Sequence, residues 1–187
     1  MLELDFSAFP ELRTERLHLR ELTQADAPAL HSMRSDPRVM QHIGRPHSTT
    51  LADSEALILR VAEDRMQNTG ITWGITLGAD PLVIGTIGYY RLKPEHHRGE
   101  IGYLLAADHW RKGFMGEALE AAVGVGFERF RFHTIEAITD PLNTASNALL
   151  ARHGFVREGL FKENYLWNGV FHDSAVWSRM SPLPPTL

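Results

Sequence analysis

The segment from Gly99 to Leu119 constrains this chain more than any other stretch. It predicts a strand over 100–106, a basic and glycine-rich loop, and a helix that begins at Glu117. The loop consists of Arg111-Lys112-Gly113-Phe114-Met115-Gly116. Such a loop aims backbone N–H groups, a helix N-terminus and two cations at one point, which favours binding of an anion. It lacks the Gly-Lys-Ser/Thr ending of a Walker A loop and the three-glycine spacing of a dinucleotide site. The spacing alone leaves open an ordinary strand-to-helix connection whose glycines serve only the turn.

The rest of the chain predicts strands and helices around this segment. Alternating apolar residues from Leu17 to Leu22 indicate a half-buried strand. Asn168-Gly169 lies between two strand-like runs and is the strongest short-range signal for a β-hairpin. Further strands are expected at 71–77, 82–90, 133–139, 155–166 and 170–179, and helices at about 26–33, 50–66, 117–132 and 143–153. Thr23-Gln-Ala-Asp26 fits a capping box at the start of the first of these helices, and Thr50-Leu-Ala-Asp53 starts the second. These elements predict a single α+β domain over residues 1–187, with short tails at 1–10 and 181–187. Its sheet is expected to be mixed, mostly antiparallel and twisted, with about four flanking helices.

Composition limits the classes of function. The 187 residues include 43% hydrophobic and 22% charged residues, which is typical of a soluble globular protein. A net charge of -4 and a pI near 6.2 argue against a nucleic-acid partner. No apolar run approaches the about 18 residues of a membrane span, and the N-terminus lacks the features of a signal peptide. We therefore expect a cytoplasmic protein with no membrane partner.

The chain has no cysteine, which excludes disulfides, thiolate metal sites and cysteine nucleophiles. His96 and His97 are adjacent, but no third ligand follows at a suitable spacing, so no metal is expected.

Two motifs in the right order carry a resemblance to a known family. The 99–119 segment has a Glu-Ile-Gly-Tyr strand, a Trp-x-Lys-Gly loop and a following Glu-Ala-Leu. It resembles the acetyl-CoA-binding motif of the GNAT superfamily of N-acetyltransferases, and within it the branch of Rim-type ribosomal-protein N-terminal acetyltransferases. The stretch from Asn143 to Phe155 resembles the second signature of that branch, Asn-x-x-Ser followed at a fixed distance by Gly-Phe. The opening strand from Thr14 and the terminal hairpin are similar as well, so the resemblance covers most of the chain. It implies the GNAT acyltransferase fold and acetyl-CoA as the acetyl donor.

The loop departs from the superfamily pattern at two positions. Trp110 stands where Gln or Arg is usual, and Met115 where Gly or Ala is usual. Because backbone N–H groups make most phosphate contacts in the family, the resemblance still implies a pyrophosphate site in this loop. The residues that it implies are Arg111, Lys112, Gly113, Phe114, Met115 and Gly116. Arg111 and Lys112 are then expected to carry more of the charge neutralisation.

The resemblance also implies contacts to the pantetheine arm of coenzyme A. These come from the main chain of Tyr103, Leu104 and Leu105 and from the side chain of Asn143. The residues alone leave open that Leu104 and Leu105 are simply core, and that Asn143 only caps a helix.

Acetyl transfer to an amine needs a base and an acid, because the amine must lose a proton and the departing thiolate must gain one. Glu100 resembles an acid often found on the acyl-presenting strand of the family, and it is the candidate base, acting through a water. Ser146 lies one helical turn after Asn143 and resembles the proton donor of the Rim-type branch. It replaces the tyrosine of many superfamily members, whose position is Leu150 here. A backbone N–H freed at a bulge within 103–105 is expected to stabilise the tetrahedral oxyanion. An exposed carboxylate and an ordinary first-turn serine remain the alternatives.

The predicted function is therefore transfer of an acetyl group from acetyl-CoA to a primary amine by direct attack in a ternary complex. By resemblance, a protein N-terminal amine is the leading acceptor. Acetylation of a small amine, such as a polyamine, an amino acid or an antibiotic, and a non-catalytic acyl-CoA-binding module stay open. The long hairpin with Trp167 and Trp177 is a candidate surface for a homodimer.

Overall fold

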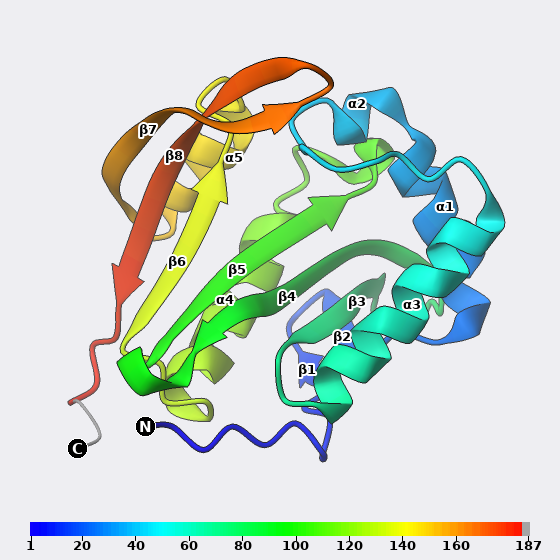
Figure 1. The fold of residues 1–187 in the computed structure, drawn as a ribbon. Coiled ribbons are helices and arrows are strands. Elements are labelled where there is room, and N and C mark those ends of the chain that lie inside the picture. The colour runs from blue at the N-terminus through cyan, green and yellow to red at the C-terminus, as the bar shows by residue number, and fades with distance from the viewer. Residues whose placement is uncertain (185–187) are drawn as a thin grey trace.

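A computed structural model describes residues 1–184 as one eight-stranded sheet with helices on both faces (Figure 1). The strands are β1 (Leu12–Arg13), β2 (Leu17–Glu21), β3 (Ile71–Leu77), β4 (Val83–Lys93), β5 (Arg98–Leu105), β6 (Thr134–Thr139), β7 (Val156–Trp167) and β8 (Val170–Met180). Their order is β1-β2-β3-β4-β5-β6-β8-β7, and only β5 and β6 are parallel neighbours. The predicted mixed, mostly antiparallel sheet is confirmed. Of the predicted tail at 181–187, residues 185–187 lie outside the described part of the chain.

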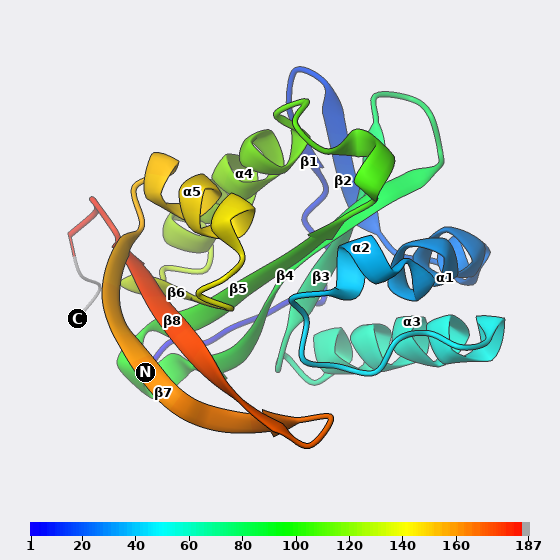
Figure 2. The ribbon, with the colours of Figure 1, turned by 90° about the horizontal axis from the view of Figure 1, so that it is seen from above.

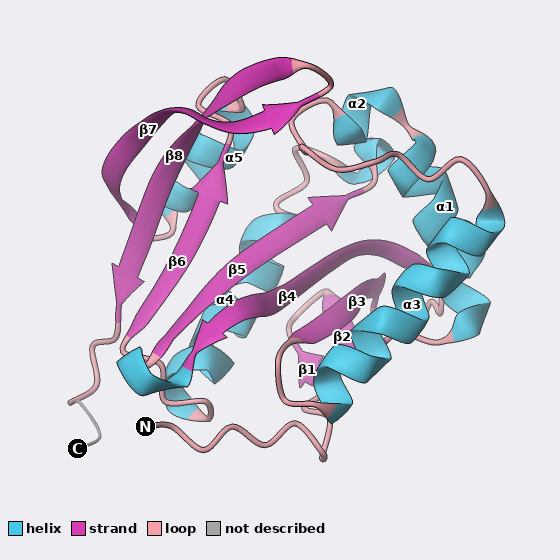
Figure 3. Ribbon diagram, in the orientation of Figure 1, coloured by secondary structure: helices cyan, strands magenta, loops and turns pink. Residues whose placement is uncertain are grey.

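The helices lie on two sides of the sheet (Figures 2 and 3). They are α1 (Ala27–Ser35), α2 (Pro37–Met40), α3 (Leu51–Met66), α4 (Phe114–Glu128) and α5 (Thr144–Arg152). Helices α4 and α5 cover one face, and α1, α2 and α3 lie on the other.

Two helix boundaries differ from the sequence prediction. Asp36-Pro37 ends α1, but the Asp36 side chain accepts a hydrogen bond from Arg38 N and starts the one-turn helix α2. Helix α4 begins at Phe114 rather than Glu117, because Gly113 adopts the left-handed conformation (φ 81) and serves as its N-cap. The end of the glycine loop is therefore the first turn of α4.

Several local signals form as their residues predict. Thr23 with Asp26, and Thr50 with Asp53, form capping boxes at the starts of a 3-10 turn before α1 and of α3. Asn168 and Gly169 both have positive φ (48 and 78), as a two-residue type I′ hairpin turn requires.

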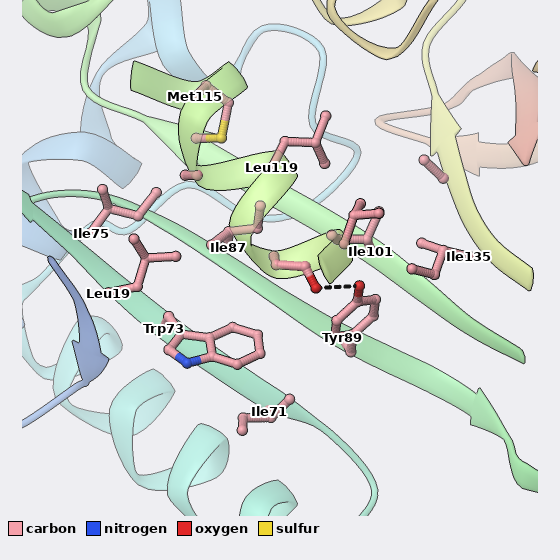
Figure 4. Close-up of a cluster of buried hydrophobic side chains, with 14 of the residues drawn as sticks. Leu19, Ile71, Trp73, Ile75, Ile87, Tyr89, Ile101, Met115, Leu119 and Ile135 are labelled. Atoms are coloured by element: carbon pink, nitrogen blue, oxygen red, sulfur yellow. Dashed lines mark hydrogen bonds between the residues drawn. The ribbon is translucent and has the colours of Figure 1, made fainter. Parts of the chain in front are cut away.

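Two apolar clusters form the core, one on each face of the sheet. The first lies between the sheet and α4, where Trp73 and Tyr89 are fully buried and the Tyr89 hydroxyl donates to Ala122 O at 2.8 Å (Figure 4). The second packs α1, α2 and α3 on the other face and contains Leu22, Leu30, Met33, Met40, Ile58, Val83 and Leu104. Residues before β1 have no regular structure, yet Phe6 is 0% exposed in the first cluster.

The terminal hairpin of β7 and β8 forms one edge of the sheet. Trp177 is buried and donates its Nε1 hydrogen to Thr139 Oγ1 at 3.1 Å, so this residue belongs to the domain interior. Phe161, Leu166 and Phe171 are exposed on the hairpin instead. The homodimer stays a prediction.

Candidate active site

The sheet opens near its centre, between β5 and β6. The two strands pair over three residues each, ending at Glu100 and Glu136, although they continue to Leu105 and Thr139. Figure 1 shows the strands diverging beyond that point. The edge of β5 over residues 101–105 is therefore unpaired on the side of β6.

The backbone of β5 alternates between β4 and this opening. Ala106 N donates to Ile84 O of β4, so the N–H group of Ala106 points toward β4. Since N–H groups alternate sides along a strand, the main chain of Leu104 also faces β4, whereas Tyr103 and Leu105 face the opening. Of the three residues predicted to pair with pantetheine, these two have main chains on the open edge. Leu104 contributes a buried side chain to the second core cluster, as its alternative interpretation held.

The predicted bulge within 103–105 is wrong. The register between β4 and β5 is regular from Leu105 back to Glu100, and the irregularity lies in β4, between Tyr90 and Lys93. N–H groups on the edge of β5 are free because β5 and β6 part, and not because a bulge distorts β5.

Glu100 and Tyr103 approach the opening from opposite faces of the sheet. Side chains alternate along a strand, so Glu100 shares its face with Leu104, which packs beside α1 and α3. Tyr103 shares its face with Ile101 and Leu105, which belong to the cluster beside α4. One group on each face thus lies at the place where the strands separate.

Glu100 is a buried, ion-paired carboxylate and not an exposed one. Its side chain is 7% exposed, and Arg91 Nη1 lies 3.2 and 3.1 Å from its two oxygens. Arg91 reaches it from the irregular part of β4, where its φ is 49. Tyr90 is the cross-strand partner of Glu100. Burial, followed by the Glu100 charge, raises the pKa of Tyr90 to about 12, so its phenol stays protonated at neutral pH.

Ser146 lies in the first turn of α5 and faces Tyr103. The two hydroxyl oxygens are 2.6 Å apart. Burial raises the pKa of Tyr103 to about 12 even though the hydrogen bond with Ser146 opposes this shift. Asn143 caps α5, because its Oδ1 accepts from Ser146 N at 3.0 Å, and this cap does not use its Nδ2 group. Leu150, at the position where many superfamily members have tyrosine, is fully buried and has no proton to donate.

The glycine loop presents a row of free donors. No acceptor within residues 1–184 bonds to the backbone N–H groups from Arg111 to Gly116. Arg111 and Gly113 have positive φ (60 and 81), which turns successive N–H groups toward a common side, and the last three belong to the first turn of α4. The side chains of Arg111 and Lys112 are exposed beside them. These donors suit a pyrophosphate.

A clamp from the β1–β2 turn holds this loop, and the sequence did not reveal it. Arg16 donates to Lys112 O at 2.9 Å and pairs with Glu117 at 2.6 Å, and Thr14 also donates to Glu117. Burial alone would raise the pKa of Glu117, but these hydrogen bonds lower it below its usual value. These bonds tie the start of α4 to the edge of the sheet formed by β1 and β2.

Two contacts join the loop after α2 to the loop before α5 and to β7, and the sequence predicted neither because they link distant segments. His42 Nδ1 lies 2.7 Å from Asp140 Oδ2, which links the loop after α2 to the loop before α5. Gly44 packs on the Tyr165 ring of β7, since a Cβ at this position would lie 2.7 Å from Tyr165 Cε2. Figure 1 shows the hairpin tip beside the loop after α2.

Within residues 1–184, no three His, Asp or Glu side chains are arranged to hold a metal ion. In the same part of the chain, no helix has the length and apolar character needed to cross a membrane.

Comparison with known proteins places this geometry in a family. The acetyltransferase (GNAT) domain family matches residues 16–156, which include the opening, the glycine loop and α5. The chain belongs to this family. The N-acetyltransferase YoaA of Bacillus subtilis, described as uncharacterized, is 35% identical over 174 residues, covering 93% of this chain and 98% of YoaA. The [ribosomal protein uS5]-alanine N-acetyltransferase of Escherichia coli is 27% identical over 179 residues, with 91% of each chain covered.

Solved structures agree on the fold. The coenzyme A complex of RimL, a ribosomal L7/L12 alpha-N-protein acetyltransferase, superposes with a TM-score of 0.84 over 92% of this chain and 98% of RimL, at 21% identity. Membership of the GNAT family, together with relatives named as N-acetyltransferases over most of the chain, makes this protein an acetyl-CoA-dependent N-acetyltransferase. The free N–H groups of residues 111–116 fit the anionic part of coenzyme A.

Proposed function

We propose that this GNAT enzyme acetylates the α-amine of a protein N-terminus, with Glu100 as the general base and Ser146 as the general acid. One observation carries the assignment: Glu100 and Tyr103, whose hydroxyl lies 2.6 Å from Ser146 Oγ, lie on opposite faces of β5 where β5 and β6 part. The proposal includes one catalytic domain over residues 1–187 and a cytoplasmic location.

The amine side of the reaction belongs to Glu100. An attacking amine must be neutral, so its proton has to move to a base, directly or through a water. The Arg91 guanidinium pairs with the Glu100 carboxylate at 3.1 Å and holds it in place. Burial of Glu100 excludes bulk water from this step.

The thioester side belongs to α5 and to the open edge of β5. The backbone N–H groups of Tyr103 and Leu105 are placed to bond to the pantetheine arm or to the oxyanion of the tetrahedral intermediate. When the C–S bond breaks, the thiolate takes a proton from Ser146 Oγ. The Tyr103 hydroxyl, 2.6 Å away and protonated at neutral pH, orients this serine. Lys112 and Arg111 neutralise the pyrophosphate beside the N–H groups of the loop.

A relative supports a protein N-terminus as acceptor. The [ribosomal protein uS5]-alanine N-acetyltransferase of Escherichia coli, whose name states an alanine of a ribosomal protein as acceptor, aligns over 91% of both chains. The side of the opening on which Glu100 lies is bordered by the loop after α2 and by the β7–β8 hairpin, which meet at Gly44 and Tyr165. An acceptor has to pass this rim to reach Glu100.

An acetyl-CoA thiol-release assay tests the proposal against a panel of peptides with Ser or Ala first, polyamines and amino acids. We expect release with peptides and loss of at least about a hundredfold in kcat for Glu100→Gln and for Ser146→Ala. Glu128→Gln, an exposed carboxylate at the end of α4, is the matched control. Release with small amines alone would instead assign a small-amine acetyltransferase. Acetyl-CoA binding without release for any acceptor would indicate a non-catalytic module.

A further inference from the structure

Three arginines lie on elements that cover the face of the sheet on which Glu100 lies, the face of α1, α2 and α3 (Figure 2). Arg34 lies on α1, Arg45 in the loop after α2 and Arg60 on α3, and we call them the arginine cluster. Arg34 Nη2 donates to Pro46 O at 3.4 Å, which places it beside the backbone next to Arg45. Burial, then the charges of Arg45 and Arg60, lowers the pKa of Arg34. Arg34 thus lies beside the loop that carries Arg45, and Arg60 lies on α3, the helix that packs on α1.

The cluster has no acidic counterpart. Among the residues that the structure describes, no carboxylate lies within ion-pair distance of Arg34, Arg45 or Arg60. Arg91, by contrast, is neutralised by Glu100 at 3.1 Å. In a chain whose net charge is -4, uncompensated cations at one place are a local feature that composition does not explain.

Arg45 links this cluster to the candidate base. Its guanidinium lies over the Tyr90 ring, 5.6 Å from the centroid, and Arg91 lies 5.8 Å from the same centroid. Tyr90 is the cross-strand partner of Glu100, and its ring covers Gly102, where a Cβ would lie 2.7 Å from Tyr90 Cε1. Arg45 is therefore one aromatic ring away from the carboxylate that receives the amine proton.

From this arrangement we infer that the acceptor carries carboxylates close to its reactive amine, and that Arg45 selects for them. The inference rests on the proposed function and specifies its substrate class: an N-terminus with Asp or Glu among the residues that follow the first. An acidic segment that leaves the amine at Glu100 would run toward Arg45 and then toward Arg34 and Arg60. A lysine-rich segment would meet the same cations and be repelled.

The test compares three octapeptides that are identical except at positions 2–4, which hold three Glu, three Gln or three Lys, together with free aspartate. With the wild-type enzyme at low salt we expect kcat/KM to be about fivefold to tenfold higher for the Glu peptide than for the Gln peptide, and lowest for the Lys peptide. Arg45→Glu should reverse the order of the Glu and Lys peptides, and Arg45→Gln should remove most of the difference. Arg157→Glu, an exposed residue on β7, changes the net charge equally and should keep the wild-type order.

Each outcome of this comparison supports or overturns the inference. Equal kcat/KM for the three peptides, or an order that Arg45→Glu leaves unchanged, would overturn the inference while N-terminal acetylation stands. A preference for free aspartate over every peptide would support the carboxylate requirement and refute the protein N-terminus as acceptor. Absence of release with all acceptors would refute both. Circular dichroism of the Arg45 variants separates a specificity change from misfolding.

Discussion

Removing the Ser146 hydroxyl is the most direct perturbation of the proposed chemistry, and its partner makes the result interpretable. A general acid contributes about 10²- to 10⁴-fold to a rate, so Ser146→Ala should lower kcat at least about a hundredfold, which corresponds to about 2.7 kcal/mol or more in activation free energy. Tyr103→Phe removes only the hydroxyl that lies 2.6 Å from Ser146 Oγ and keeps the ring in the core. The loss of one hydrogen bond is worth about 1 kcal/mol, which is about a fivefold fall in kcat.

The two substitutions together test whether Tyr103 acts through Ser146. If it does, the double variant should have the kcat of Ser146→Ala within about a factor of two, because the second hydroxyl then has nothing to orient. Burial raises the pKa of Tyr103 to about 12, so the effect of Tyr103→Phe should be the same at about pH 7 and about pH 9. The assay is thiol release at saturating acetyl-CoA. Thr144→Ala removes an exposed hydroxyl from the same helix turn and should keep the wild-type rate.

Two results would refute the reasoning. Wild-type kcat in Ser146→Ala would remove this serine from the mechanism. A fivefold effect of Tyr103→Phe that persists in the Ser146→Ala background would show that Tyr103 acts by packing or on another group, and not through Ser146.

Three further expectations concern stability and cofactor affinity. Gly124→Ala should stabilise the protein by up to about 1 kcal/mol, because its Cβ would meet open space. Gly126→Ala should destabilise the protein by about 1–3 kcal/mol, since its Cβ would lie 2.9 Å from atoms of Tyr89 and Ile135. Urea unfolding measures both free energies, and equal effects would contradict this packing. Lys112→Ala should raise KM for acetyl-CoA about threefold with kcat unchanged, and the rise should be smaller at high salt. A rise in KM that is the same at low and high salt would argue against charge neutralisation by Lys112. Burial raises the pKa of Asp26, but hydrogen bonds, led by those from Arg20, outweigh it and lower that pKa, so the pair stabilises above the unfolded pKa of about 3.9 and the gain is lost as pH falls through the lower folded value. Asp26→Asn should therefore unfold at lower urea concentration at neutral pH and lose less stability on acidification; equal urea midpoints for the two proteins at neutral pH would contradict this role of the pair.

Signals within a few residues predicted most of the fold. The turn at Asn168-Gly169 and the capping boxes at Thr23 and Thr50 formed because each depends only on neighbouring backbone groups. The same locality explains the correct placement of Asn143 as a helix cap and of Ser146 in the turn after it.

Contacts between distant segments were beyond such signals. Nothing near Glu100 in sequence indicates that Arg91 will reach it, because that depends on a β4 irregularity in which a non-glycine residue has φ 49. The clamp of Arg16 on Glu117 and the bridge between His42 and Asp140 join residues about a hundred positions apart. Each required the assembled sheet.

The mistaken bulge shows what a strand sequence does and does not determine. Period-two alternation places Glu100 and Tyr103 on opposite faces of any strand that contains both, and a continuous sheet would keep them apart. They serve one reaction only if the neighbouring strand leaves. The ladder between β5 and β6 ends at Glu100, so the first residues beyond the base are also the first with a free edge. The parting of β5 and β6 therefore has the effect that was predicted for a bulge. It frees N–H groups on the edge of β5, and it makes one opening accessible to side chains from both faces of the sheet. The parting depends on the course of β6 relative to β5 (Figure 1), so it could not be predicted from residues 99–119 alone.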